Sequence, residues 1–124
     1  MRVLLVDDDA NARRVTRKML ERSGHEVAEG ENGLQGITLL RTSTFDFVVT
    51  DMVMPVMNGV EFIKTARRLA PTLKVVAMSG GGRTSSTDYL ETARQHGAAA
   101  TLHKPFTLTD LTDSIGQCFG GKAA

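Results

Sequence analysis

The sequence predicts an α/β domain built on a parallel five-stranded sheet with helices on both faces. Short apolar runs alternate five times with segments of helical period along the 124 residues. Three of these runs, at 3–6, 47–49 and 75–78, are continuously apolar, as strands covered on both faces should be. Such alternation indicates parallel strands joined by right-handed helical crossovers. The expected order of elements is therefore (βα)5, a doubly wound sheet.

The strands and helices follow one another at regular intervals. Strands are expected at VLLV, EVAE, FVV, VVAM and ATLH, which span 3–6, 26–29, 47–49, 75–78 and 100–103. The second run is the least apolar, so we expect it at an edge of the sheet. The helices are expected on five apolar stripes: Ala12, Val15 and Met19; Leu34, Ile37 and Leu40; Phe62, Ile63, Ala66 and Leu69; Tyr89, Leu90 and Ala93 within 84–96; and Leu108, Leu111, Ile115 and Cys118.

Capping and turn residues mark the ends of these helices. Asn58 can cap the third helix, and Ser85–Asp88 and Thr107–Asp110 have the spacing of capping boxes. Helices are expected to stop before Gly24, Pro71 and Gly97. The last helix ends shortly before GGKAA. We therefore expect one domain over 1–119 and a flexible tail over 120–124.

Composition excludes several classes of protein. The net charge of +1 favours neither nucleic acid nor an anionic membrane surface. Cys118 is the single cysteine, which excludes an internal disulfide and fits a reducing compartment. No apolar run approaches the ~20 residues of a membrane span, and MRVLLVDDD turns acidic too early for a signal peptide. We expect a cytoplasmic protein that binds neither membrane nor nucleic acid directly.

Polar side chains gather where the predicted strands end. Ligands of open parallel α/β sheets bind beyond the carboxyl ends of the strands. The central strands are followed there by carboxylates, a hydroxyl and an ammonium group: Asp7, Asp8 and Asp9 after the first, Asp51 after the third, Ser79 with Gly80, Gly81 and Gly82 after the fourth, and Lys104 with Pro105 after the fifth. We therefore expect these groups at one edge of the sheet.

This combination of groups is suited to phosphoryl transfer. Carboxylates that converge repel one another unless a cation compensates, and Lys104 supplies only one positive charge. Oxygen ligands shared with water and phosphate are those that Mg²⁺ prefers. The pattern predicts a carboxylate nucleophile, a bound Mg²⁺, and contacts from Lys104 and Ser79 to the phosphoryl oxygens.

Four motifs carry a resemblance to a known family. VDDD at 6–9, TDMVMPVMNG at 50–59, MSG at 78–80 and HKPF at 103–106 resemble, in order and spacing, the receiver domains of two-component response regulators, including chemotaxis regulators. The resemblance covers the whole chain. It implies a flavodoxin-like fold with strand order 2-1-3-4-5, and a phosphorelay switch that catalyses only its own phosphoryl acceptance and loss. We expect a receiver that stands alone, although a domain excised from a larger regulator remains an alternative.

The resemblance also implies roles for individual residues. Asp51 is expected to accept the phosphoryl group from a phosphohistidine of a sensor kinase or phosphotransfer protein. Asp8 is expected to bind Mg²⁺ directly and Asp7 mostly through water, while Asp51 and the backbone carbonyl of Val53 complete the protein ligands. Ser79 and Lys104 are expected to contact phosphoryl oxygens. Two further expectations complete the comparison: a cis peptide bond at Pro105, and Asp9 at the start of a helix rather than on the metal.

The sequence departs from the family at Thr101. Members usually carry Tyr or Phe at this place, three residues before the lysine, and the aromatic rotamer reports phosphorylation. A threonine cannot move in and out as a ring does. We therefore expect Ser79 and Thr101 to mark the switch region, with output through movement of the 79–82 loop and the fourth helix. A downstream partner is expected on the surface of the fourth helix, fifth strand and fifth helix.

Other interpretations of these residues stay open. Asp7 and Asp8 can be helix caps, the Ser79 loop and Lys104 can be ordinary strand ends, and the chain can be a scaffold of receiver shape without phosphorylation. A haloacid-dehalogenase-type phosphohydrolase would instead use Asp7 as nucleophile. A basic run on the first helix is either a solvated face or a docking surface for a kinase or phosphotransfer protein: Arg13, Arg14, Arg17, Lys18 and Arg22.

Overall fold

Five strands and five helices alternate along the chain, as predicted. The structure, a computed structural model, describes residues 1–80 and 86–120. The strands are β1 Arg2–Val6, β2 Glu26–Gly30, β3 Phe47–Asp51, β4 Lys74–Gly80 and β5 Ala100–Lys104. The helices are α1 Ala10–Arg22, α2 Gly33–Thr42, α3 Gly59–Leu69, α4 Ser86–Gln95 and α5 Leu108–Cys118. None of the described helices is both long and apolar enough to cross a bilayer.

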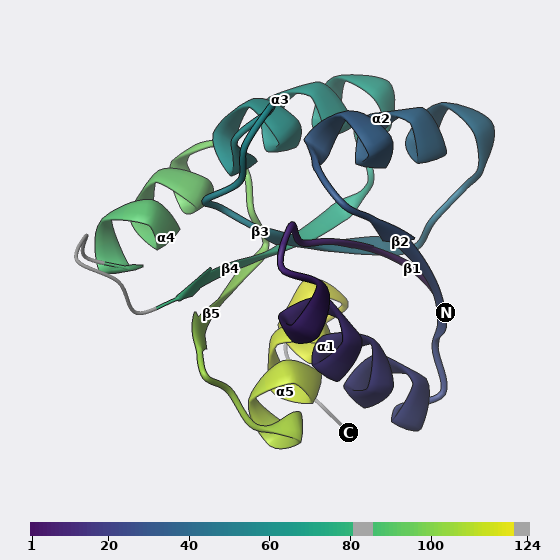
Figure 1. Cartoon of the computed structure of the whole chain (residues 1–124), viewed down its shortest axis with the longest axis vertical. Coiled ribbons are helices and arrows are strands. Elements are labelled where there is room, and N and C mark those ends of the chain that lie inside the picture. The colour runs from purple at the N-terminus through teal and green to yellow at the C-terminus, as the bar shows by residue number, and fades with distance from the viewer. Residues whose placement is uncertain (81–85, 121–124) are drawn as a thin grey trace.

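The strands form one parallel sheet in the order β2-β1-β3-β4-β5, which confirms the predicted order. Helices α1 and α5 lie on one face, and α2, α3 and α4 lie on the other (Figure 1). The chain order steps from β1 outward to β2 and then back across to β3. In such sheets a ligand crevice opens at the carboxyl ends of the strands where the order reverses, here between β1 and β3.

The core lies in two layers, one on each face of the sheet. Under α1 and α5 the sheet packs against Leu20, Leu111 and Ile115, all nearly or fully buried. On the opposite face two clusters pack under α2, α3 and α4, around Phe62 and Leu90. Burying a large apolar side chain contributes about 1.5–3 kcal/mol. The sheet is therefore held on both faces, which fixes the ends of its central strands.

The apolar stripe that we predicted for the first helix is right at Met19, which packs against the core, but wrong at Val15. Val15 is 55% exposed, and α1 instead buries Thr16 and Leu20. Threonine can occupy this inward place because its methyl group packs while its hydroxyl remains able to hydrogen-bond. Three further residues predicted on inward stripes are more than one-third exposed and lie at helix ends: Leu34, Leu69 and Leu108.

The helix ends agree with the predicted caps where the structure describes them. Asn58 accepts from the Glu61 N–H at the start of α3, and Thr107 and Asp110 form a reciprocal capping box on α5. Asp9 caps α1 by accepting from the N–H groups of Asn11 and Ala12, which confirms its place at a helix start. Several expectations depend on residues outside the described ranges: the Ser85–Asp88 cap, the roles of Gly81 and Gly82, and most of the tail 120–124.

Candidate functional site

The central strands deliver polar side chains to one edge of the sheet. Asp51 is the last residue of β3, Ser79 is the last but one of β4, and Lys104 is the last of β5. Ser79 and Lys104 thus belong to their strands, whereas we had placed them just after the strand ends. Asp7 follows β1 directly, and its N–H donates to the Gly30 carbonyl at the end of β2. Parallel register therefore brings these residues together, as predicted.

Lys104 joins two carboxylates at the centre of this edge. Its Nζ lies 3.1 Å from Asp7 Oδ2 and 3.1 Å from Asp51 Oδ2. Burial by itself would lower the pKa of Lys104, but the charges of Asp51 and Asp7 and their hydrogen bonds outweigh it and raise this pKa. The ammonium group therefore stays charged and compensates the two acids. The Lys104–Pro105 peptide bond that follows is cis, as expected.

Asp7 is fully buried, and both of its carboxylate oxygens have partners. Oδ1 accepts from the Asp9 N–H at 3.0 Å, and Oδ2 accepts from Lys104. A carboxylate with no exposed surface cannot readily reach a substrate in solution, whereas the Asp51 side chain is 12% exposed. The phosphohydrolase alternative, in which Asp7 is the nucleophile, therefore gains no support from the geometry.

Asp51 is also buried, with its side chain 12% exposed. Oδ1 accepts from the Met52 N–H at 2.8 Å, and Oδ2 accepts from Lys104. Burial raises the pKa of Asp51, and the charge of Asp7 adds to this, while Lys104 and the Met52 N–H offset only part of it. The ionised carboxylate is therefore a costly group in the folded protein. A nearby cation would favour this ionised form.

We predict that this carboxylate makes stability depend on pH. The pKa of Asp51 in the folded protein lies above its usual 3.8, so the fold retains the proton to higher pH than the unfolded chain does. Without metal ions, the free energy of unfolding should therefore fall as pH rises from 3.8 through the raised pKa. Asp51→Asn removes this dependence. Urea unfolding of both proteins at several pH values measures the difference in stability, and a constant difference would refute the prediction.

Asp8 completes an acidic cluster with Asp7 and Asp51. One ligand oxygen from each of the three residues lies within 4.8 Å of the others, and Asp8 is exposed while the other two are buried. Carboxylate oxygens open to water on one side suit Mg²⁺, which retains several waters. The donor set therefore fits a small divalent cation.

Ser79 adds a second indication that the site takes a ligand. Its Oγ is buried and has no hydrogen-bond partner among the residues that the structure describes. A buried hydroxyl without a partner is costly, and native proteins rarely leave one unless a ligand or water contacts it. The hydroxyl lies at the end of β4, between the strands that carry Asp51 and Lys104. This place is suited to hydrogen bonding with an anion bound at the site.

The loop after Asp51 packs tightly against the start of α3. The Gly59 N–H donates to the Met52 carbonyl at 2.9 Å, and a Cβ at Gly59 would lie only 2.6 Å from Met52 Cα. Glycine is therefore required for this close approach. Met52 and Met54 are buried below the loop, whereas Val53 is 55% exposed.

Val56 in the same loop has an unusual backbone conformation. Its φ is 72°, and the Met57 N–H donates to the Pro55 carbonyl at 2.8 Å, which closes a three-residue γ-turn. A β-branched residue at positive φ is strained. Val56 is 71% exposed, so packing does not offset this strain.

We predict that Val56→Gly stabilises the protein. Glycine adopts positive φ without steric strain, and relief of such strain is worth about 1–3 kcal/mol. The greater entropy of the unfolded chain with glycine offsets part of this, so the free energy of unfolding should rise by about 1 kcal/mol. Val53→Gly is the matched control, since Val53 is also exposed in this loop but has no positive φ. The control should lower stability, because glycine increases the entropy of the unfolded chain. Urea unfolding measures the free energy of unfolding of both variants. A loss of stability in Val56→Gly would contradict the claim that Val56 is strained.

Two further residues lie outside this cluster of charges: Thr101, which we predicted as part of the switch region, and Arg13, whose contact with the site we did not predict. Thr101 faces α4, where its Oγ1 accepts from Arg94 at 2.8 Å. Arg13 was predicted only as part of a basic run, yet its side chain is 14% exposed and donates to the Asp7 carbonyl. An arginine one helical turn after an acidic loop was the only sequence signal for this contact, and it does not distinguish a buried arginine from a solvated one.

Comparison with known proteins agrees with this geometry. Residues 3–116 match the model of the family described as "Response regulator receiver domain". The chain is 34% identical over 114 residues to the response regulator receiver protein CpdR of Brucella abortus (strain 2308), which covers 92% of each chain. It is 25% identical to sporulation initiation phosphotransferase F of Bacillus subtilis (strain 168), over 92% of this chain and 90% of that one.

A solved structure shares the fold over nearly the whole chain. The receiver domain protein from Clostridium thermocellum superposes with a TM-score of 0.85 at 27% identity, and the match covers 94% of this chain and 92% of that one. The family match, the strand order and the edge at which Asp7, Asp51 and Lys104 meet all agree. The chain therefore belongs to the family of response regulator receiver domains, which act as switches in two-component signalling rather than as classical enzymes.

Proposed function

We propose that Asp51 accepts a phosphoryl group from a phosphohistidine of a sensor kinase or phosphotransfer protein. The observation that carries the proposal is the position of the Asp51 carboxylate, which ends β3 beside Asp7, Asp8 and Lys104. An Asp51 oxygen forms a bond to phosphorus while the bond from phosphorus to the histidine nitrogen breaks. The electron pair of the broken bond stays on the nitrogen. The product is an aspartyl phosphate.

We assign the metal ligands to the acidic cluster and the loop after β3. Asp8 and Asp51 would bind Mg²⁺ directly, together with the carbonyl of Val53, and Asp7 would act mostly through water. The full burial of Asp7 supports this division, since Asp8 is exposed and the Asp51 side chain is 12% exposed. When bound, Mg²⁺ neutralises charge on the phosphoryl oxygens and on the carboxylates around them.

Ser79 and Lys104 would contact the phosphoryl oxygens of the modified protein. The Ser79 hydroxyl is buried at the end of β4 without a partner among the described residues, so it can donate to an incoming oxygen. The Lys104 ammonium group donates a hydrogen bond to the Asp51 carboxylate, and it would donate one to a phosphoryl oxygen of the modified protein while keeping its proton. Both groups are in place before the reaction, which lowers the reorganisation that the reaction requires.

The exposed face of α1 is our candidate for docking of the phosphodonor. Receiver domains interact with kinases or phosphotransfer proteins and with downstream effectors. In this chain Arg13 and Arg17 are paired with Glu29. The remaining basic residues of the run are exposed: Arg14, Lys18 and Arg22. Lys18 and Arg22 also line a pocket together with Val15. The basic run thus divides between an internal network and a surface suited to a partner.

We propose that output passes through α4 and β5 without an aromatic gate. Arg94 of α4 donates to Thr101 of β5 and also pairs with Glu91 at 3.3 Å. A shift of α4 would break or re-form this hydrogen bond. The surface of α4, β5 and α5 is therefore our candidate for a downstream protein partner.

Incubation with acetyl phosphate tests the proposal, because an acyl phosphate can replace phosphohistidine as donor. With Mg²⁺ present, intact-protein mass spectrometry should show one added phosphoryl group per chain. With a chelator present, the added mass should be absent or strongly reduced. Absence of the added mass at saturating Mg²⁺ would contradict the proposal and favour a scaffold of receiver shape.

A further inference from the structure

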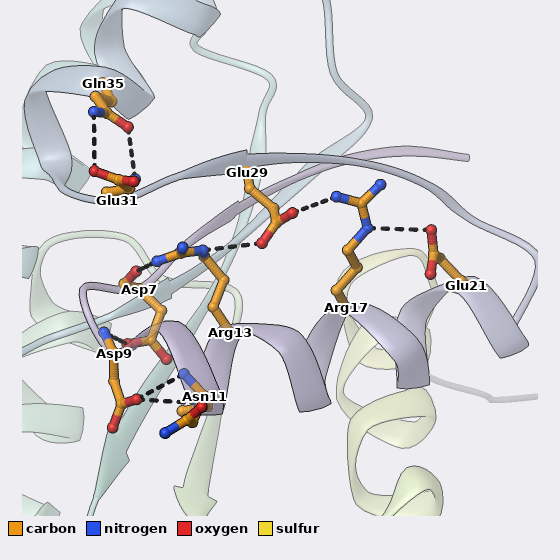
Figure 2. Close-up of polar contacts among 10 residues, drawn as sticks. Asp7, Asp9, Asn11, Arg13, Arg17, Glu21, Glu29, Glu31 and Gln35 are labelled. Carbon is orange, nitrogen blue, oxygen red and sulfur yellow. Dashed lines mark hydrogen bonds and ion pairs between the residues drawn. The ribbon is translucent and has the colours of Figure 1, made fainter.

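Arg13 connects the acidic loop after β1 to the edge strand β2. From the first turns of α1, its Nη1 donates to the Asp7 backbone carbonyl at 2.8 Å, and its Nε donates to Glu29 Oε1 at 2.9 Å. Figure 2 shows the guanidinium group lying between these two partners. Within the described part of the chain, Arg13 makes no hydrogen bond or ion pair with a side chain of the acidic cluster. Its contact with the site is through the backbone alone.

The contact matters because Asp8 depends on its backbone for position. Asp8 is exposed, and no hydrogen bond to its carboxylate is present among the described residues. Its neighbours are fixed: Asp7 by buried hydrogen bonds, and Asp9 by capping α1. The peptide between Asp7 and Asp8 carries the carbonyl that Arg13 holds. The direction in which Asp8 leaves the backbone is thus set in part by Arg13.

Glu29 in turn fixes the guanidinium group of Arg13. One carboxylate oxygen of Glu29 accepts from Arg13, and the other accepts from Arg17, which also pairs with Glu21 at 3.2 Å (Figure 2). Burial alone would raise the pKa of Glu29, but hydrogen bonds from Arg17 and Arg13 lower it overall, so Glu29 stays ionised. Glu29 is partly buried at 28% side-chain exposure. The carboxylate that holds the Arg13 guanidinium group is therefore ionised and fixed by hydrogen bonds on both of its oxygens.

We propose that Arg13 is a positioning residue for Mg²⁺ binding: held by Glu29, it fixes the Asp7 carbonyl and thereby places the Asp8 carboxylate for the metal. The inference rests on the proposed function, because it takes Asp8 to be a metal ligand. Groups that hold metal ligands in place without touching the metal commonly change metal affinity by about 10–100-fold when removed.

Simple electrostatics predicts the opposite result. Arg13 carries a positive charge near the acidic cluster, so its removal alone should favour binding of a divalent cation. A positioning role predicts that removal weakens binding. Lysine at this place retains the charge but has no planar fork with which to hold two oxygens at once. The direction of the change therefore distinguishes positioning from charge.

The test compares Mg²⁺ affinity in four proteins by titration calorimetry: wild type, Arg13→Gln, Arg13→Lys and Arg17→Gln. Arg17→Gln is the matched control, since Arg17 also binds Glu29 from α1 but does not contact Asp7. We expect both Arg13 variants to bind Mg²⁺ about 10-fold more weakly or worse. We expect Arg17→Gln to stay within about 2-fold of wild type. Thermal unfolding of each variant verifies that it is folded under the conditions used.

A second measurement does not require Mg²⁺. In metal-free protein, Arg13→Gln should speed amide hydrogen exchange at Asp9, whose N–H donates to Asp7, by about 10-fold, while Arg17→Gln should not. Equal or tighter Mg²⁺ binding in Arg13→Gln, or equal effects of the Arg13 and Arg17 variants, would overturn the inference. If wild type binds no Mg²⁺, the proposed function fails, and unchanged exchange at Asp9 in Arg13→Gln would then reject the positioning role as well.

Discussion

An Asp51→Asn variant is expected to gain no phosphoryl group from acetyl phosphate, whereas the wild-type protein gains one in the presence of Mg²⁺. The amide cannot attack phosphorus as a carboxylate does, and Asp51 is the cluster carboxylate that ends a central strand. The variant should remain folded, because it replaces a buried charge that burial disfavours with a neutral group of the same shape. Intact-protein mass spectrometry measures the added phosphoryl group in both proteins.

Asp7→Asn is the matched control for this experiment. Asp7 is equally close to Lys104 and more deeply buried than Asp51. We expect the Asp7 variant to react more slowly, through weaker metal binding, yet still to gain the phosphoryl group. Complete loss in Asp7→Asn together with normal modification of Asp51→Asn would reverse the assignment and support the phosphohydrolase alternative.

Lys104→Met is expected to lower the free energy of unfolding by about 3 kcal/mol in metal-free protein at neutral pH. The change leaves the carboxylates of Asp7 and Asp51 facing each other without the cation that now bridges them. Loss of one partner from a buried ion pair typically costs about 3–5 kcal/mol. The Lys104 side chain is 21% exposed, which places the expected loss at the lower end. Urea unfolding at neutral pH measures it.

A double-mutant cycle separates this charge effect from lost packing. In Lys104→Met/Asp51→Asn, only the Asp7 carboxylate lacks compensation, so the loss should be much smaller than in Lys104→Met alone. Saturating Mg²⁺ should also restore part of the stability of Lys104→Met, since binding to the folded state stabilises it. A loss that neither Asp51→Asn nor Mg²⁺ reduces would show that Lys104 acts through packing rather than charge.

Much of the fold and the site followed from pattern alone. Continuously apolar runs such as 47–49 occur in buried parallel strands, and the order of motifs indicated which strand ends would meet. Asp51 and Lys104 are far apart in the chain but lie 3.1 Å apart in the structure, because the parallel sheet brings their strand ends to one edge. Periodicity was sufficient for the alternation of strands and helices and for the shared edge, whereas the strand order was expected only from the resemblance to receiver domains.

Side-chain direction on the first helix did not follow from the sequence. Val15 was expected inward because it is apolar, but the packing of α1 turns Thr16 and Leu20 toward the sheet. Tertiary packing rotates a helix by a fraction of a turn, and a polar residue such as threonine tolerates the buried place. A stripe of only a few apolar residues is therefore enough to predict a helix. It is not enough to predict which face of that helix is buried.

The network around Arg13 and the turn at Val56 were missed for related reasons. Arg13 and Glu29 are far apart in sequence, and an arginine in a basic run gives no sign of a partner on an edge strand. Val56 adopts positive φ without the glycine or asparagine that usually marks such a place. Both features arise from the assembled fold, in which neighbouring elements impose contacts that local sequence does not specify.

The most direct test of the central claim is to map the phosphoryl group on the wild-type protein. After reaction with acetyl phosphate and Mg²⁺, borohydride reduction converts an aspartyl phosphate to a stable alcohol, and peptide mass spectrometry then locates the altered residue. We expect the alteration at Asp51 alone. Alteration at Asp7 or Asp8 instead, or no alteration in a protein shown to bind Mg²⁺, would contradict the proposed phosphoacceptor.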